Sequence, residues 1–470
     1  MSSKISEAMQ VYELIKKLGS AEIRDMRIVL RSDWFNYRED VRQLFDILVK
    51  AVSKQGEMPD KAFIFSKIYP EKEPDDRLMR LLGSWLTDAV EDYMRWKTIA
   101  GNPVGGHMAL ASAYRKKNLP TLFQKNIRQA QEQLEQQPIR NADYLRQKHD
   151  VLAETFRFEA ATKRTEALNV QGMSDALDHW YFAQKLRQVC TALSHQNVFK
   201  TEYTFSLLDV MLEQIERDNL LEFPAIDLYY HCYKVLSEPD NEAGFARFLE
   251  KIVQHGACFP EEELRDLYVL GLNFCTRRIN EGSQPHVRAG FELYRAGFEK
   301  KIFLVDGVLS RFTYRNAAAL GLLLGELEWV RTFLDEFRYF IEPKYRDSNY
   351  HFNLARWEYE MKNYDIALLL LQHSESEDLL AALAAKTLIA KILFNIGAFD
   401  ALHSHLDAMQ IFLKRHKEIS YHRANYVHFI RFTRKLTTAS ADQRAALRTA
   451  IVQEKAVSEK KWLLEKSEGA

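Results

Sequence analysis

Three aromatic residues spaced 35 positions apart constrain the fold of this chain more than any other feature. Trp329, Tyr364 and Phe399 each follow a glycine or a polar break, as in "KNYDIALLLL" and "GAFDALHSHL". The residues between two such breaks suffice for a pair of helices, and helical pairs that recur at a fixed spacing are typical of solenoid proteins. The spacing therefore predicts a stack of antiparallel helical hairpins.

The low content of turn-forming residues supports a helical fold for the whole chain. Of 470 residues, 18 are glycine and 11 are proline, which is about 4% and 2% against the usual 7% and 5%. Sandwich and barrel folds need turn residues at short, regular intervals. We therefore expect an all-α protein in which a small helical N-terminal domain precedes an α-solenoid of antiparallel helical hairpins.

Changes in the helical pattern divide the chain into four expected regions. Residues 1–100 are expected to form the N-terminal helical domain, which ends at the glycine-rich stretch "AGNPVGG" (100–106). Residues 105–262 are expected to form degenerate hairpin repeats, residues 263–436 clearer repeats, and residues 437–470 capping helices and a tail. The last region is expected to cover the final exposed face of the array with apolar side chains: Ile451, Val452, Val457 and Trp462.

The stretch "KNYDIALL" resembles the turn and second helix of the tetratricopeptide-repeat family, whose unit is a helix-turn-helix of about 34 residues. Tyr364 and Ala367 stand where the family pattern has an aromatic and a small residue. The resemblance covers residues 307–412, and it departs from the pattern in its period of 35 and in Thr332 and Leu402 at the small-residue position. It implies that the first helix of each unit lines a concave surface that binds another protein or a peptide.

In the family, certain positions of the first helix face the concave surface. The same positions in the three repeat units of this chain predict which residues form that surface. They carry aromatic, basic and amide side chains that suit an acidic or amphipathic peptide: Arg356, Tyr359, Lys391, Phe394 and Asn395. The alternative interpretation is that some of these side chains pack against neighbouring helices.

The sequence contains no motif typical of a catalytic, cofactor or metal site. Glycine-rich phosphate-binding motifs, Gly-x-Ser-x-Gly and His-Glu-x-x-His do not occur. His403 and His405 lie two residues apart, which places them on nearly opposite faces of a helix. We therefore expect a non-catalytic protein with no cofactor and no metal ion. An enzyme whose site is assembled from residues distant in the sequence is an alternative that this reasoning leaves open.

Charge and hydropathy indicate a cytoplasmic protein. The chain carries 65 basic and 65 acidic residues, so its overall charge favours neither nucleic acid nor anionic membranes. The N-terminus lacks the apolar segment of a signal peptide, and no apolar run reaches the length of a membrane span. Four cysteines lie far apart without a Cys-x-x-Cys pair, so we expect reduced thiols in the core: Cys190, Cys232, Cys258 and Cys275.

One segment supports a different function. "RAGFELYRAGFEKKIF" (288–303) resembles the second helix of a pentatricopeptide repeat, a family that binds single-stranded RNA. Basic residues stand close to it in the sequence: Arg277, Arg278, Lys300 and Lys301. An RNA-binding helical-repeat protein is therefore the alternative to a protein-binding scaffold.

Overall fold

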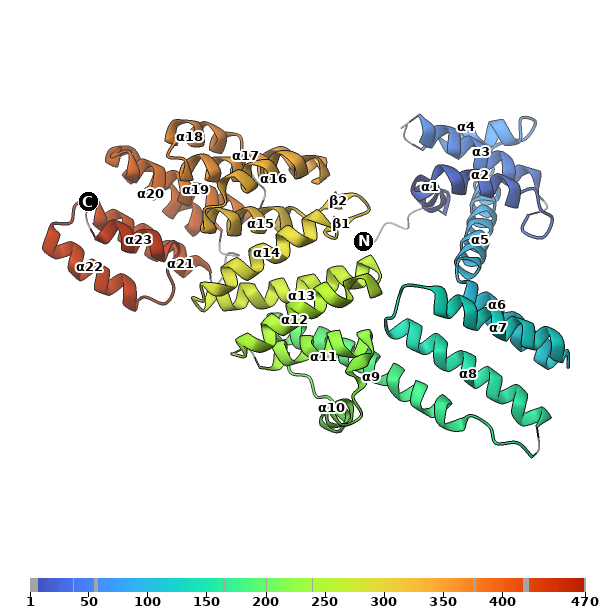
Figure 1. Ribbon diagram of the computed structural model, residues 1–470. Coiled ribbons are helices and arrows are strands. Elements are labelled where there is room, and N and C mark those ends of the chain that lie inside the picture. Colours follow the sequence, from blue (N-terminus) through green and yellow to red (C-terminus); the bar gives the residue numbers. More distant parts are fainter. Residues whose placement is uncertain are drawn as a thin grey trace. The chain divides into compact units, whose positions relative to one another are not determined.

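The computed structural model describes residues 7–36, 38–54, 58–163, 165–199, 201–238, 240–374, 378–416 and 422–468. Over these residues the chain forms the helices α1 to α23, and its only strands there are β1 (Leu304–Val305) and β2 (Val308–Leu309) (Figure 1). The prediction of an all-α fold is confirmed. Among the helices so described, none is both long enough and apolar enough to cross a membrane.

The helices group into two compact units, residues 1–184 and 185–470. The first unit contains α1 (Glu7–Lys17), α2 (Ser20–Val29), α3 (Glu39–Ser53), α4 (Lys61–Ile68), α5 (Asp76–Ala100), α6 (Pro103–Lys116), α7 (Pro120–Gln136), α8 (Ala142–Thr162) and the first half of α9 (Val170–Phe199).

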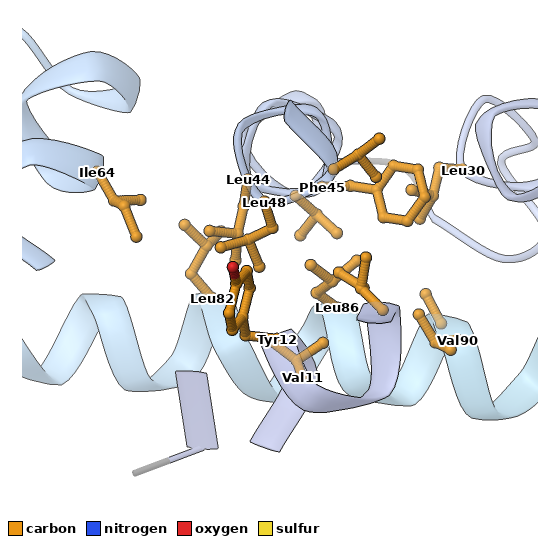
Figure 2. Packing of buried hydrophobic residues seen from close by; sticks show 14 of the residues in the cluster. Val11, Tyr12, Leu30, Leu44, Phe45, Leu48, Ile64, Leu82, Leu86 and Val90 are labelled. Carbon is orange, nitrogen blue, oxygen red and sulfur yellow. The ribbon is translucent and has the colours of Figure 1, made fainter. Parts of the chain in front are cut away.

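The long helix α5 is the centre of the N-terminal core. Its apolar residues recur every three to four positions, which places Leu82, Leu86 and Val90 on one face. Figure 2 shows this face directed at Leu44 and Leu48 of α3. Helices α1 and α2 also contact α5, so the first five helices enclose one core.

At the predicted boundary, residues 100–106, only Gly101 and Asn102 connect α5 to α6. Asn102 caps α6, because its side chain accepts a hydrogen bond from the backbone N–H of Gly105 at 2.9 Å. Pro103 occupies the first turn of α6. Backbone N–H groups in the first turn have no hydrogen-bond partner within the helix, so a residue without an N–H is tolerated there. Most of the glycine-rich stretch is therefore the beginning of a helix.

The second unit continues with α10 (Leu208–Arg217), α11 (Pro224–Ser237), α12 (Glu242–His255), α13 (Glu261–Asn280), α14 (Pro285–Glu299), α15 (Arg311–Leu324), α16 (Leu327–Phe337), α17 (Pro343–Glu360), α18 (Tyr364–Gln372), α19 (Leu379–Asn395), α20 (Phe399–Arg415), α21 (His422–Leu436), α22 (Ala441–Gln453) and α23 (Lys460–Ser467). Short 3₁₀ helices follow α10, α12 and α16: η1 (Leu220–Glu222), η2 (Gly256–Cys258) and η3 (Arg338–Phe340).

Contacts in the second unit follow the order of the chain. Consecutive helices pair as hairpins, namely α11 with α12, α13 with α14, α15 with α16, α17 with α18 and α19 with α20. The first helix of a hairpin also contacts the first helix of the next, as α15 does α17 and α17 does α19. Contacts restricted to nearest neighbours are the property that defines a solenoid of helical hairpins.

Two of the three repeat aromatics have matching surroundings. Tyr364 begins α18 and lies 5.8 Å, between ring centroids, from Tyr359 near the end of α17. Phe399 begins α20 and lies 5.8 Å from Phe394 near the end of α19. Each ring thus packs on an aromatic residue five positions earlier, at the point where the hairpin turns.

Trp329 has a different environment. It is the third residue of α16 rather than the first, and its ring meets Phe291 of the preceding hairpin edge to face at 4.8 Å. It also stacks on Phe333 of its own helix at 4.9 Å. The 35-residue spacing therefore locates the second helix of this hairpin but not the packing of its aromatic residue.

Close packing around Gly297 of α14 gives a prediction for stability. A Cβ atom at this position would overlap the ring of Phe303, which is buried against Tyr294 and Phe298. We expect Gly297→Ala to lower the free energy of unfolding by about 1–3 kcal/mol through overpacking, measured by urea unfolding followed by circular dichroism. Gly106→Ala is the control, because a Cβ atom there meets nothing within 4 Å; equal stability of the two variants would contradict the expectation.

Candidate functional site

Helices α17 and α19 bring three of the predicted site residues together. The Nδ2 atom of Asn395 donates a hydrogen bond to the hydroxyl of Tyr359 at 3.1 Å and another to Tyr364 at 3.3 Å. The Nζ atom of Lys391 lies 4.8 Å from the centre of the Tyr359 ring. Asn395 thus connects two successive hairpins, and Tyr359 is held between an amide and an ammonium group.

Phe394, although it precedes Asn395, takes part in packing within the chain. Its ring meets that of Trp462 on α23 edge to face at 5.2 Å, and Trp462 is only 5% exposed. Both belong to the hydrophobic cluster of the C-terminal hairpins. For Phe394 the structure therefore shows contacts with a neighbouring helix.

Lys391 is neutralised by a residue far along the chain. Its Nζ atom forms an ion pair of 2.8 Å with Glu459, the residue directly before α23. The Lys391 side chain is 14% exposed, so water screens this pair only in part. Lys391 therefore already has an acidic partner within the chain.

Arg356 differs from Lys391 in this respect. It is half-buried on α17, and within the described residues no carboxylate lies within ion-pair distance of its guanidinium group. Burial lowers its pKa, Glu459 and Glu360 raise the pKa from a distance, and the like charge of Arg315 on α15 lowers it. A guanidinium group stays protonated in proteins, so Arg356 is a cation without a close anion among the described residues.

A hollow that the sequence reasoning missed lies where α15 and α17 begin. Its volume is about 280 Å³, and Arg311, Phe312, Glu342 and Tyr345 are among the residues that line it. The Arg311 guanidinium is 4.0 Å from the centre of the Tyr345 ring and 4.9 Å from that of Phe312. Such cation–π contacts hold Arg311 against both rings.

The β1–β2 hairpin positions the residues that line this hollow. Leu309, the last residue of β2, forms a parallel β-bridge with Ile341. The next residue is Ser310, whose hydroxyl accepts a hydrogen bond from the backbone N–H of Phe312 at 3.3 Å. This cap begins α15, and the bridge keeps that beginning beside the beginning of α17. The first turn of α15 is thereby fixed at the rim of the hollow.

A second, smaller hollow continues from the first. It shares Arg311 and Phe312 and extends to Arg315, to Asn349 and to Asp378, the residue that caps α19. The described residues offer no carboxylate within ion-pair distance of Arg311 or Arg315. Together with Arg356 on the neighbouring helix α17, they are three cations of this kind.

Helices α15, α17 and α19 are the first helices of three successive hairpins, and α17 contacts both α15 and α19. We call the surface that these first helices share the first-helix face. The side chains used below are Arg311, Phe312, Arg315, Arg356 and Lys391.

The sequence pattern could not assign the α15 residues because the repeat is irregular there. Thirty-five positions before Arg356 stands Gly321, which packs against Val330 and Phe291 and offers no side chain to a partner. The α15 residues that line the hollows, Arg315 and Arg311, lie six and ten positions before Gly321. The available signal was a pair of arginines four positions apart directly after a serine cap.

Cysteines and potential metal ligands are further candidates for a chemical site among the described residues. All four cysteines are unpaired, and three of them are buried. Burial raises the pKa of Cys275 to about 12, which keeps this thiol protonated and unreactive. In the part of the chain that the structure covers, no three His, Cys, Asp or Glu side chains are placed to hold a metal ion.

Comparisons with known proteins give no family for this chain: no family model, no curated protein and no solved structure matches it. Inference about its function therefore depends on the first-helix face.

Proposed function

We propose that this protein is a non-catalytic interaction scaffold that binds a partner protein or peptide on its first-helix face. The observation that carries the proposal is the group of Arg311, Arg315 and Arg356 on two neighbouring helices, which have no acidic partner among the described residues. Arg311 and Arg315 also line hollows that Phe312 borders. Arginine and aromatic side chains are enriched where proteins bind one another. The resemblance to tetratricopeptide repeats supports the same function, and the unpaired cysteines support a cytoplasmic location.

RNA binding is less well supported. Of the basic residues near the pentatricopeptide-like segment, Arg278 pairs with Asp240 at 3.0 Å and with Glu281 at 2.8 Å. A groove that follows a phosphate backbone needs cations that are available along its length. The ratio of absorbance at 260 and 280 nm distinguishes the two functions, since a purified RNA-binding array retains nucleic acid.

The scaffold function is tested by removing an aromatic ring from the first-helix face. Phe312 is 48% exposed, so Phe312→Ser is expected to leave the fold intact while weakening capture of partner proteins about tenfold, the effect of about 1.4 kcal/mol at an interface. The measurement is affinity capture from the source cells with quantitative mass spectrometry, followed by titration of the captured partner. Leu369→Ser on α18 is the control, because Leu369 is 57% exposed on a second helix. Identical partner sets for the wild type and both variants would refute the proposal.

A further inference from the structure

The outward face of α2 in the first unit carries two arginines around an isoleucine. Arg24, Ile28 and Arg31 follow one another at spacings of four and three residues, which places them on one face of α2 and of the turn that extends it. All three side chains are exposed, and Ile28 is 68% exposed. Met26 on the opposite face is buried in the N-terminal core. The face of Arg24, Ile28 and Arg31 is therefore directed away from that core.

Two of the arginines on this face are free to pair with an external anion. Among the described residues, no carboxylate lies within ion-pair distance of Arg24 or Arg31. Arg27, on the same face, is different, because its Nε atom lies 3.1 Å from Oδ1 of Asp46 on α3. The exposed cations Arg24 and Arg31 thus lie on either side of Ile28 without acidic partners in the part of the chain that the structure describes.

Trp34 lies in the turn after α2 and is 90% exposed. Hydrogen bonds hold the backbone on both sides of it. The buried amide of Asn36 donates to the carbonyl oxygens of Leu30 and Arg38, each at 2.9 Å, and Nε of Arg42 donates to the same Leu30 carbonyl at 2.7 Å. A turn fixed in this way presents its indole to a partner without the entropic cost of ordering a loop.

The composition of this surface is typical of a protein interface. Single exposed apolar side chains are common on proteins, but tryptophan and arginine are enriched among the residues that dominate binding energy. Within residues 24–34, an almost fully exposed indole follows an exposed isoleucine and two unpaired guanidinium groups. Burial of the indole on binding supplies apolar stabilisation, and the arginines supply specificity for an acidic partner.

We propose that α2 and the following turn form a second docking surface, defined by Arg24, Ile28, Arg31 and Trp34, which we call the α2 surface. It binds a protein whose apolar cleft receives the indole of Trp34 and whose carboxylates pair with Arg24 and Arg31. The proposal goes beyond the scaffold function on the first-helix face, because the α2 surface belongs to the other compact unit. A chain with both surfaces can hold two partner proteins together.

Acidic residues at the α2 surface favour a protein over a membrane or a nucleic acid. Asp33 in the turn after α2 is exposed, and the Asp46 side chain that pairs with Arg27 is half exposed. An anionic membrane or a nucleic acid presents negative charge across its whole surface, so it meets these carboxylates together with the arginines. A protein can place its own carboxylates opposite Arg24 and Arg31 alone.

The nature of the occupant is tested by photo-cross-linking of the intact protein. Trp34 is replaced by the photoreactive residue p-benzoylphenylalanine, and the protein is irradiated in an extract of the source cells. Mass spectrometry is expected to identify a cross-link to another protein, at a segment where apolar residues lie next to Asp or Glu. The control is the same replacement at Phe63, which is 51% exposed on α4 and is expected not to form that cross-link.

The contribution of the side chains is then measured with the purified partner that the cross-link identifies. Fluorescence anisotropy of the labelled partner is expected to show binding about tenfold weaker to Trp34→Ser and to an Arg24→Gln, Arg31→Gln double variant. Arg77→Gln, Arg80→Gln is the matched control for charge, because both arginines are exposed on α5. Circular dichroism and thermal unfolding of each variant confirm that loss of binding is not loss of fold.

The inference is overturned by a cross-link from position 34 mainly to lipid, to nucleic acid or to a second copy of this chain, since each of these is a different occupant. Absence of any cross-link in the extract refutes it as well. The same holds for a partner that binds the Trp34→Ser protein and the double arginine variant as tightly as the wild type. If the binding of that partner depends on Phe312 instead, the scaffold function stands and the α2 surface alone fails.

Discussion

Replacement of Asp227 by asparagine is expected to lower the free energy of unfolding by about 3–5 kcal/mol, because it leaves buried cations without their anion. The Asp227 side chain on α11 is 2% exposed. Its Oδ2 atom lies 2.7 Å from Nζ of Lys251 and 2.8 Å from Nε2 of His255, and Oδ1 lies 3.3 Å from Nε2 of His231. One carboxylate thus connects α11 with α12, and urea unfolding followed by circular dichroism measures its contribution.

The same cluster predicts how stability depends on pH. Burial by itself would raise the pKa of Asp227, but hydrogen bonds from His231, Lys251 and His255 outweigh burial and lower the pKa to about 2. Since the folded-state pKa lies below the usual value of about 3.9, the stabilisation is complete above that value and is lost as pH falls toward 2. A shift of nearly two pH units corresponds to about 2–2.5 kcal/mol.

A control for both measurements is Asp209→Asn on α10, because Asp209 is exposed. This variant is expected to unfold as the wild type does at neutral pH and to keep the wild-type loss of stability in acid. Asp227→Asn is expected to be less stable at pH 7 and to lose less of its remaining stability between pH 5 and pH 2. An Asp227→Asn protein with wild-type stability at neutral pH would show that the cluster contributes nothing to folding.

The fold could be predicted from the sequence because a helix depends on local composition and on the spacing of apolar residues along one segment. The scarcity of glycine and proline gave the all-α class, and the apolar stripe of α5 gave the face that packs on α3. The spacing of Tyr364 and Phe399 located two hairpin turns whose aromatic pairs match. The β1–β2 hairpin could not be foreseen, because two short strands carry too few residues for a periodic signal.

The candidate site was predictable only where the repeat is regular. Arg356, Tyr359 and Asn395 were found on α17 and α19, and Tyr359 and Asn395 are in contact. Arg311 and Arg315 were missed because the position that corresponds to Arg356 in α15 is Gly321, whose place is filled by packing against Val330 and Phe291. The ion pair of Lys391 joins residues 68 positions apart, and no pattern within one repeat reports a contact of that range.

Phe333 of α16 is the position where the largest loss of core packing is expected. It is 3% exposed, and its ring centroid lies 4.7 Å from that of Phe298, 5.1 Å from that of Tyr314 and 4.9 Å from that of Trp329. Phe333→Ala would leave a cavity among these rings and is expected to lower the free energy of unfolding by about 3–5 kcal/mol. Urea unfolding measures this loss.

This prediction also concerns the first-helix face, because Tyr314 belongs to α15 and its hydroxyl donates a hydrogen bond to the carbonyl of Leu334 on α16 at 2.9 Å. Loss of the Phe333 ring loosens the support of α15 and with it the position of Arg315. The Phe333→Ala protein is therefore expected to bind the partner proteins captured by the wild type more weakly, although residue 333 lines neither hollow. Phe63→Ala on α4, where the side chain is 51% exposed, is the control for both properties. Equal stability of the Phe333→Ala and Phe63→Ala proteins would show that the aromatic cluster does not hold α15 in place.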